Sequence, residues 1–363
     1  MDGVDAVLCE VDAKECTPLF TYEHPFPQAL KEKILNLIAG KCTLAEVGTV
    51  DRHLGELFAQ AVNTLLEKSA VDPQSVAAIG SHGQTVWHAP SGKRPFSMQL
   101  GDPNVIVAQT GIAVVADFRR KDMACGGQGA PFAPAFHRFL LGEEIRGVCV
   151  VNIGGIANIT VLEEVLIGYD TGPGNMLMDL WIAKHKGLSY DKDGNWAREG
   201  SVDYRLLEMM MQDAYFAKPY PKSTGRETFN EKWVEQSVQR VACSVQENAA
   251  EALHSNANNN SSFPPVDVQR TLLELTALTI SNEVLTFNPD MLMLCGGGAR
   301  NGFLVERIAA LMPNVQVGVM AHSESLEAMM MAWLAYKRLH NETVALKEVT
   351  GAQNNTILGG VYR

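Results

Sequence analysis

Apolar positions along the first third of the chain switch between a strand pattern and a helical pattern. Residues 4–11, VDAVLCEV, are a short β-rich run that predicts a strand. Apolar residues then recur at helical spacing over 27–40 and again over 50–69, which predicts two amphipathic helices. Two more strands are predicted at the starts of 76–88 and 112–131. The first ends in a glycine turn and the second in a loop rich in glycine and charge.

A second series of strands and helices follows a helical stretch at 134–142. Its predicted elements are two strands within 147–162 hinged on Gly154 and Gly155, a strand at 165–175, helices at 175–187, 201–217, 231–251, 266–287 and 325–340, and a strand, glycine turn and helix within 290–312. The polar, Asn/Ser-rich stretch 254–265 is predicted to be a loop. This alternation predicts an α/β protein with mostly parallel sheets, and the two successive series predict two lobes.

Length and charge narrow the class of protein. A chain of 363 residues exceeds what one hydrophobic core usually serves. The formal net charge is −11, and no dense Lys/Arg tract is present. These features argue against a nucleic-acid or anionic-membrane surface, but not against a site for one small anion. No apolar run reaches the length of a membrane span, and no basic-then-apolar leader is visible.

Cysteine and histidine usage points to the cytoplasm and away from a structural metal site. The seven cysteines form no CxxC pair, which is typical of reduced, buried thiols in a cytosolic protein. The nine histidines show no HExxH or similar ligand spacing.

Two glycine-rich turns follow predicted strands. They are NIGGIAN at 152–158 and CGGGARN at 295–301, and the second leads directly into a helix. Missing side chains allow backbone N–H groups to approach a phosphate or a nucleotide. Neither turn fits GxxxxGK[ST] or GxGxxG, so P-loop and Rossmann sites are disfavoured. Tight packing between strands and helices remains the alternative explanation for both turns.

Polar residues gather where three predicted strands end, at 81–85, 99–103 and 116–122. Open α/β sheets bind ligands at the carboxyl ends of their strands, so we expect these loops to converge. Arg119 and Arg120 are candidates to clamp a carboxylate or phosphate. A solvated cluster of charges is the alternative.

Asp170 lies in GYDTGPGN, where glycines leave little side chain around its carboxylate. Such a carboxylate can reach a hydroxyl or a water without crowding, which suits a general base or a metal contact. The alternative is a plain Asx-turn to its own backbone, and the local sequence alone favours this turn over a chemical role.

Taken together, these stretches resemble the anhydro-N-acetylmuramic acid kinase family. The segments that carry the resemblance are DGVDAVL, GSHGQTVWH, GDPNVIV, ADFRRKDMACGGQGAP, NIGGIANIT, YDTGPGNMLMD, YFAKPYPKSTGRETFN, DVQRTLLELTA, CGGGARN, LEAMMMAWLA and TGAQNNTILGGVY. The resemblance implies a two-lobed, actin-like ATPase fold of the ribonuclease H-like type, with a central cleft. An N-terminal lobe is expected over 1–130 and a C-terminal lobe over 131–363, with the last segment packing back on the first lobe.

The resemblance also implies an activity. Members of this family use ATP and Mg²⁺ to open the 1,6-anhydro bond of the sugar with water and to phosphorylate O6, giving N-acetylmuramic acid 6-phosphate in peptidoglycan recycling. By matching position, Asp170 would be the base that deprotonates the attacking water. The implied sugar-binding residues are Thr85, Asp117, Arg119 and Glu327. The implied cofactor-binding residues are Asp2, Gly3, Val4, Asp5, Gly154, Gly155, Gly296, Gly297 and Gly298. The metal ligands are left unassigned.

The chain departs from the family pattern at its start. Family members usually open with GxMSGTSxDGVDAV, whereas this sequence opens with MDGVDAV. We therefore expect the first strand and part of the phosphate loop to be missing and the chain as written to be unstable or weakly active. A longer natural reading frame and a shortened paralogue are the two explanations.

Other functions stay open at this stage. A plain sugar or carboxylate kinase of the same fold would not need the anhydro ring, and a catalytically impaired nucleotide-binding paralogue would close on its ligand without turnover. The expected partners are the sugar and ATP, with no nucleic acid and no membrane, and a homodimer is the commonest symmetric arrangement.

Overall fold

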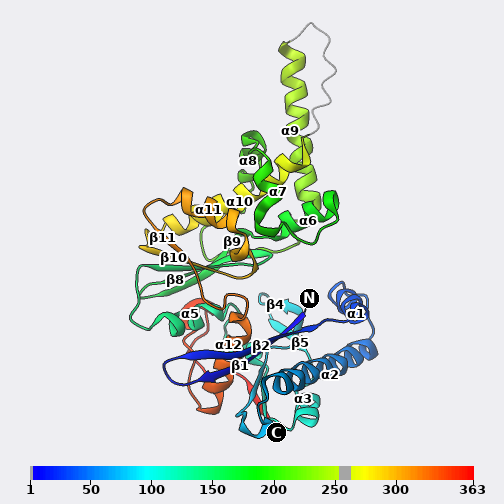
Figure 1. The fold of residues 1–363 in the computed structure, drawn as a ribbon, viewed down its shortest axis with the longest axis vertical. Helices are drawn as coiled ribbons and strands as arrows, with labels where there is room; N and C mark the ends of the chain where they lie inside the picture. Colours follow the sequence, from blue (N-terminus) through cyan, green and yellow to red (C-terminus); the bar gives the residue numbers. More distant parts are fainter. Residues whose placement is uncertain (1–2, 253–262) are drawn as a thin grey trace. The chain divides into compact units, whose positions relative to one another are not determined.

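The computed structural model describes residues 3–252 and 263–363, and for 244–252 it describes the backbone only. Asp2 and most of the predicted loop 254–265 lie outside the described residues. The chain divides into two compact units, the first made of Met1–Ile145 with Ser325–Arg363 and the second of Arg146–Glu324 (Figure 1). No described helix is both long enough and apolar enough to span a membrane.

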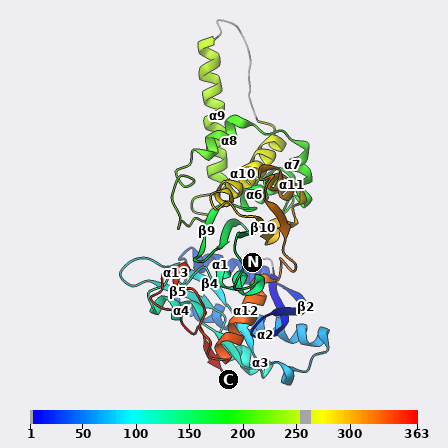
Figure 2. The same ribbon diagram turned by 90° about the vertical axis from the view of Figure 1, so that its left-hand side faces the viewer.

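The first unit is built from short sheets and the helices beside them. Its elements are β1 (Gly3–Val11), β2 (Cys16–Pro25), α1 (Gln28–Ile38), α2 (Leu44–Ser69), η1 (Pro73–Ser75), β3 (Ile79–Ser81), β4 (Gln84–Ala89), β5 (Phe96–Leu100), α3 (Pro103–Thr110), β6 (Val114–Ala116), α4 (Phe118–Ala124), α5 (Ala133–Leu141), α12 (Leu326–Leu339), α13 (Lys347–Thr350) and β12 (Gly360–Tyr362). Strand order is β1-β2, β12-β6-β3 and β4-β5. Helix α12 packs against β1 and β3, and Figure 2 shows it, in orange, among the elements of this unit.

The first unit extends further along the chain than the sequence suggested, because it includes helix α5. The sequence put the boundary after residue 130, whereas α5 belongs to the first unit. The rings of Phe136 and Phe139 lie 5.5 and 5.4 Å from the ring of Trp333 on α12. Aromatic packing of this kind stabilises the contact between α5 and α12.

The second unit contains one five-stranded sheet with helices packed on it. Its elements are β7 (Val148–Ile153), β8 (Ile156–Leu162), β9 (Leu166–Pro173), α6 (Met176–Lys186), η2 (Lys192–Gly194), α7 (Asn195–Glu199), α8 (Tyr204–Met211), α9 (Glu231–Ala252), α10 (Pro265–Leu285), β10 (Met291–Cys295), η3 (Gly297–Arg300), α11 (Gly302–Leu311) and β11 (Gln316–Val319). Strand order is β11-β10-β7-β8-β9. Helix α10 is buried along most of its length and packs on α6, α8 and α11.

The predicted α/β class is confirmed, but the prediction of mostly parallel sheets is wrong. Strand β10 runs parallel to β7 and β11, and β3 runs parallel to β6. The pairs β1-β2, β4-β5, β6-β12, β7-β8 and β8-β9 are antiparallel. Connections as short as Gly154–Gly155 allow only a hairpin, because parallel neighbours need a long crossover. The prediction of a loop rich in glycine and charge after β6 is also partly wrong, since residues 118–124 form helix α4.

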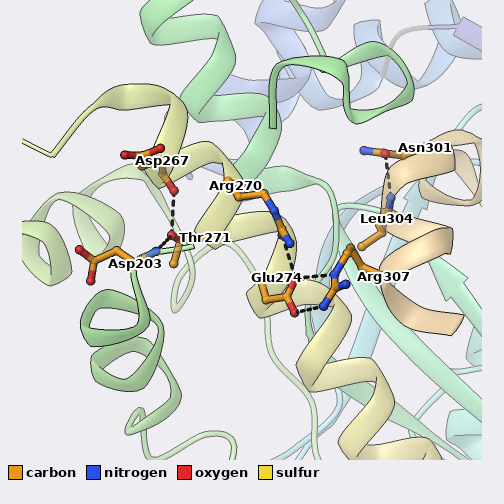
Figure 3. Close-up of polar contacts among 8 residues, drawn as sticks. All are labelled: Asp203, Asp267, Arg270, Thr271, Glu274, Asn301, Leu304 and Arg307. Carbon is orange, nitrogen blue, oxygen red and sulfur yellow. Dashed lines mark hydrogen bonds and ion pairs between the residues drawn. The ribbon is translucent and has the colours of Figure 1, made fainter. Parts of the chain in front are cut away.

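A buried carboxylate joins α10 to α11 in the second unit. Both carboxylate oxygens of Glu274 accept hydrogen bonds, from Arg270 at 2.8 Å and from Arg307 at 2.9 and 3.0 Å (Figure 3). Burial raises the pKa of Glu274, but the hydrogen bonds from Arg307 and Arg270 outweigh it and leave the pKa lowered. Nearby, the Asp203 amide donates to Thr271, and Asn301 caps α11 by accepting from the Leu304 amide.

Candidate active site

Asp170 lies in the second half of β9, and one of its carboxylate oxygens is held by hydrogen bonds. The Ser223 hydroxyl donates to Oδ2 at 2.9 Å, and the Thr224 amide donates to the same oxygen at 3.0 Å. Within the described part of the chain, no hydrogen bond to Oδ1 is recorded. The carboxylate is therefore oriented by one oxygen and keeps a free acceptor on the other.

The backbone of Asp170 is held on both sides. Its amide donates to the carbonyl oxygen of Lys222 at 3.0 Å, and its carbonyl accepts from the Tyr215 hydroxyl at 2.6 Å. Asp170 pairs with Asn158 of β8, and Gly172 pairs with the adjacent residue Ala157. Strand β9 therefore has one extra residue between these two pairs, which makes a β-bulge. Bulges of this kind redirect side chains next to functional sites.

Burial sets the basicity of Asp170. Desolvation by burial raises its pKa, and the negative charge of Glu227 adds to the rise. The hydrogen bonds from Thr224 and Ser223 oppose this, and the pKa stays above the usual aspartate value. A carboxylate with a raised pKa is a stronger base than a fully solvated one.

The glycine-rich turn at 152–158 is joined by backbone hydrogen bonds to the segment 168–175, which contains Asp170. The amides of Gly174 and Asn175 donate to the carbonyl oxygens of Gly155 and Gly154 at 2.9 and 2.8 Å. A Cβ on Gly174 would lie 2.2 Å from the Gly154 carbonyl oxygen, so only glycine fits there. These two hydrogen bonds hold the start of α6 against the hairpin turn between β7 and β8.

The third glycine run packs against the same turn. A Cβ on Gly296 would lie 2.2 Å from Oδ1 of Asn152, and one on Gly298 would lie 2.3 Å from Ile153. Packing alone therefore accounts for these two glycines. A Cβ on Gly154, Gly155 or Gly297 would make ordinary van der Waals contacts at 3.4 to 3.7 Å, so packing does not require glycine at these three positions.

Arg119 is the centre of a polar group in the first unit. Its Nε donates to Nε2 of His82 at 3.0 Å, and Nη1 donates to the Gly129 carbonyl oxygen at 2.7 Å. The guanidinium carbon also lies 5.4 Å from the Phe132 ring centroid. Burial lowers the pKa of Arg119, while the charge of Glu327 opposes the change. An arginine so fixed presents its remaining nitrogen in a defined direction.

Glu327 and Asp5 belong to the electrostatic surroundings of Arg119. Desolvation raises the pKa of Glu327, the charge of Asp5 raises it further, and Arg119 lowers it. Glu327 lies in the first turn of α12 and Asp5 lies on β1, so helix α12 and strand β1 bring two carboxylates near one cation. The neighbouring residues Gly3 and Val4 pair with Pro25 and His24 in the β1-β2 hairpin.

Thr85 lies at the end of a chain of polar side chains on β4 and β5. Nε2 of Gln99 donates to the Thr85 hydroxyl at 3.1 Å and to the Ser97 hydroxyl at 2.7 Å. Nδ1 of His88 lies 3.0 Å from the Ser97 hydroxyl. The charge of Arg119 contributes to a lowered pKa of His88, after burial, so this chain lies within electrostatic range of Arg119.

Asp117 and Arg120 form a pair of their own. Asp117 has a left-handed backbone at φ 62°, and its Oδ1 accepts from Arg120 Nε at 2.6 Å. Both residues line an open hollow of about 830 Å³ that also includes Lys121 and Arg338. No hydrogen bond between Asp117 and Arg119 is recorded in the part of the chain that the structure describes. Arg119 and Arg120 therefore bond to different partners, and the clamping of an anion by these two arginines stays a prediction.

Comparison with known proteins identifies the family. A family model described as anhydro-N-acetylmuramic acid kinase matches residues 1–363. The chain belongs to this family.

Curated relatives agree with this membership along the full length. The chain is 61% identical over 362 residues to the anhydro-N-acetylmuramic acid kinase of Sulfurovum sp. (strain NBC37-1), covering 100% of this chain and 96% of that protein. It is 46% identical over 372 residues to the enzyme of the same name from Aliivibrio fischeri (strain ATCC 700601 / ES114), with the same coverage of 100% and 96%.

A solved structure offers a distant likeness. A ROK family glucokinase from Streptomyces griseus in complex with glucose and AMPPNP is 12% identical, over 92% of this chain and 100% of that chain, with a TM-score of 0.38. A TM-score this low does not establish a shared fold. Membership of the kinase family therefore rests on the sequence matches.

Several residues of the candidate site were not assigned from the sequence. Ser223 and Thr224 lie in the family segment PKSTGRE, but nothing in that segment indicates that they bind Asp170, 53 and 54 residues away. His82 lies in SHGQT, one of the three strand-end loops that we expected to converge, and its bond to Arg119 shows that two of these loops meet.

Proposed function

We propose that this protein is an ATP-dependent kinase that hydrolyses the 1,6-anhydro bond of 1,6-anhydro-N-acetylmuramic acid and phosphorylates O6. Membership of the family along the full chain supports the reaction. One observation supports the assignment of the base, namely that Asp170 is held through Oδ2 while Oδ1 is open. A turn-forming aspartate would instead bond to its own backbone within two or three residues.

The proposed chemistry balances with one protein base. A water oxygen attacks the anomeric carbon while Asp170 takes one of its protons, and the bond from the anomeric carbon to O6 breaks. O6 then attacks the γ-phosphorus, whose bond to the bridging oxygen of ADP breaks. Because the phosphoryl group captures O6, no separate general acid is needed to protonate it.

The glycine junction of the second unit fits a nucleotide phosphate. Packing does not require glycine at Gly154, Gly155 and Gly297, and these glycines lie on turns that are hydrogen-bonded or packed together. Backbone N–H groups that no side chain of their own covers can bind phosphate oxygens. Gly296 and Gly298 would support this surface by allowing close packing, rather than by contacting ATP themselves.

Mg²⁺ would be held mainly by the phosphates of ATP. Among the described residues, no group of three or more His, Cys, Asp or Glu side chains is placed to hold a metal ion. Magnesium in kinases commonly uses only one or two carboxylates and keeps several waters. Among the described residues predicted to bind the cofactor, Asp5 has the carboxylate that suits magnesium. When bound, the ion would neutralise charge on the transferred phosphoryl group.

The sugar would be bound by the polar group of the first unit. Arg119 is held by His82 and Gly129, and its remaining nitrogen would donate a charge-assisted hydrogen bond to the sugar's lactyl carboxylate. The Thr85 hydroxyl and the Glu327 carboxylate would bind polar groups of the sugar. Asp117, which is paired with Arg120, would first have to exchange that partner.

The proposed setting is peptidoglycan recycling and amino-sugar catabolism in the cytoplasm, with the sugar and ATP as partners. The proposal also includes a homodimer, because two-fold dimers are the commonest symmetric assemblies.

A substrate comparison tests the proposed function. The purified chain is given ATP and Mg²⁺ with either the 1,6-anhydro sugar or N-acetylmuramic acid, and ADP release and the mass of the product are followed. The proposal predicts a 6-phosphorylated sugar from the anhydro form at a rate at least about 10²-fold above that with the open sugar. Equal rates with both sugars would identify a plain sugar kinase instead, and nucleotide binding without turnover would contradict an active enzyme.

A further inference from the structure

Lys222 is a buried lysine directly before the two donors that hold Asp170. Its side chain is 3% exposed, and Nζ lies 2.5 Å from Oε1 of Glu283, whose side chain is 18% exposed. Nζ also donates to the Phe216 carbonyl oxygen at 3.3 Å and lies 5.2 Å from the Tyr215 ring centroid. The ammonium group is thus enclosed by one carboxylate, one carbonyl and one aromatic face.

Glu283 connects this lysine to two further elements. It lies on α10, and its second oxygen, Oε2, accepts from the Tyr169 hydroxyl at 2.8 Å. Tyr169 directly precedes Asp170 on β9 and stacks on Tyr220 with ring centroids 5.3 Å apart. The ion pair therefore fixes the segment 220–222 to both α10 and β9.

The segment fixed in this way surrounds Asp170. The Lys222 carbonyl accepts from the Asp170 amide, the Ser223 hydroxyl bonds Oδ2, and the Thr224 amide bonds Oδ2. Three consecutive residues thus contact one aspartate, and only the first of them is anchored by its side chain to the helix behind. A shift of Lys222 would move all three contacts together.

A contribution to folding stability does not by itself explain the buried Lys222–Glu283 ion pair. Taking a lysine and a glutamate out of water costs about as much as their attraction returns, so apolar residues of similar size are often as stable or more so. Buried pairs are best attested where they define one geometry. Here the defined geometry is that of the loop that orients a carboxylate.

We propose that the Lys222–Glu283 ion pair is a positioning device for the catalytic base, holding the 222–224 loop so that Asp170 is bound at Oδ2 and open at Oδ1. This inference rests on the proposed role of Asp170. Lys222 and Glu283 are positioning residues, since they act on Asp170 through Ser223 and Thr224.

The charges around Asp170 decide how the inference can be tested. Glu227 raises the pKa of Asp170 by charge, whereas Thr224 and Ser223 lower it by hydrogen bonding. The charge of Asp170 in turn raises the pKa of Tyr215, after burial. A variant that removed only Lys222 or only Glu283 would also change the local charge. The paired substitution Lys222→Met with Glu283→Gln removes one positive and one negative charge, so the net charge is kept.

The test measures kcat and kcat/KM against pH for the paired variant. Loss of the loop geometry should weaken both hydrogen bonds to Oδ2 and raise the pKa of Asp170. The acid limb of the profile should therefore move to higher pH by roughly one unit for each hydrogen bond lost. At the plateau, kcat should fall by at least about ten-fold because the base is misplaced, while KM for the sugar changes by less than about two-fold.

Two single variants separate positioning from general loss of stability. Ser223→Ala removes one hydrogen bond to Oδ2 and leaves the ion pair intact, so it should move the acid limb in the same direction. Glu274→Gln is the matched control, because it removes a buried glutamate from the same helix, bonded to Arg270 and Arg307 rather than to the loop. It should lower thermal stability without moving the acid limb.

Each outcome has a separate meaning. If the paired variant is folded and keeps the wild-type acid limb and kcat, the positioning role is overturned. If Glu274→Gln moves the acid limb as far as the paired variant does, the shift reflects stability, and the inference is also overturned. If instead Asp170→Asn retains activity, the proposed base is wrong, which is a distinct failure read from a distinct variant.

Discussion

Arg119 donates a hydrogen bond from Nε to Nε2 of His82 at 3.0 Å. Nδ1 of the same ring lies 2.7 Å from the Gly83 carbonyl oxygen, so the ring proton is assigned to Nδ1 and the imidazole is neutral. Burial, followed by the charge of Arg119, lowers the pKa of His82 to about 4. The histidine therefore serves as a neutral acceptor that orients the guanidinium throughout the physiological pH range.

Loss of this acceptor should weaken sugar binding. His82→Ala should raise KM for the anhydro sugar by about ten-fold, the equivalent of one good hydrogen bond, with a smaller effect on kcat. His82→Gln keeps an acceptor oxygen and should recover most of the affinity. Steady-state kinetics with saturating ATP measure both variants. An unchanged KM in His82→Ala would mean either that Arg119 does not bind the sugar or that His82 does not orient Arg119.

The pH dependence of the rate should report Asp170. A base must be ionised, so activity is lost as pH falls through its pKa. Because burial raises the pKa of Asp170, we expect the acid limb of kcat/KM to lie above the ordinary aspartate value of about 3.9. Rate measurements from acid to neutral pH, with stability checked at each point, locate this limb. A limb at or below the ordinary value would contradict a desolvated base.

The junction of the glycine turns should be intolerant of a methyl group. Gly174→Ala places a Cβ 2.2 Å from the Gly154 carbonyl oxygen and should lower the free energy of unfolding by about 1–3 kcal/mol or more. Gly302→Ala is the matched control, because a Cβ there meets nothing within 4 Å at the start of α11. It should be neutral or stabilise by up to about 1 kcal/mol. Denaturant unfolding of both variants measures the difference, and equal stabilities would contradict the packing described.

Stability should fall in mild acid because of a buried histidine. His137 is 3% exposed, and burial lowers its pKa to about 4 from 6.5. The unfolded chain takes up this proton as pH falls below 6.5 and the folded chain only near pH 4, so folding loses up to about 3 kcal/mol across that window.

His137→Gln should remove this part of the pH dependence. The variant should lose less stability than the wild type between pH 6.5 and 4, as measured by urea unfolding at each pH. Parallel stability curves for the two proteins would contradict a histidine that is buried in its neutral form.

Elements with a strong local pattern could be predicted from the sequence. The helices at 50–69, 266–287 and 325–340 appear as α2, α10 and α12, because each shows a long apolar repeat. The two strands hinged on Gly154 and Gly155 also appear as predicted. Strand β2, at Cys16–Pro25, was missed because it alternates with prolines and charges and is set by pairing with β1.

The partners of the site residues could not be predicted in the same way. Asp170 was a candidate from its glycine surroundings, but its contacts with Ser223 and Thr224 depend on how α10 and β9 pack. Lys222 would be taken for a surface residue in any local analysis, since only the folded chain shows Glu283 opposite it. Asp117 and Arg119 are two residues apart but make separate contacts, because Asp117 adopts a left-handed backbone before α4.

The central claim, that Asp170 is the base for water attack, is tested most directly by Asp170→Asn. The amide oxygen of asparagine can still accept from Ser223 and Thr224, so the fold should be kept, as thermal unfolding would show. The measurement is kcat for 6-phosphorylated sugar from the anhydro sugar, ATP and Mg²⁺. We predict a loss of about 10²–10⁴-fold with little change in substrate binding. A folded variant that retained kcat within about ten-fold of the wild type would contradict the account.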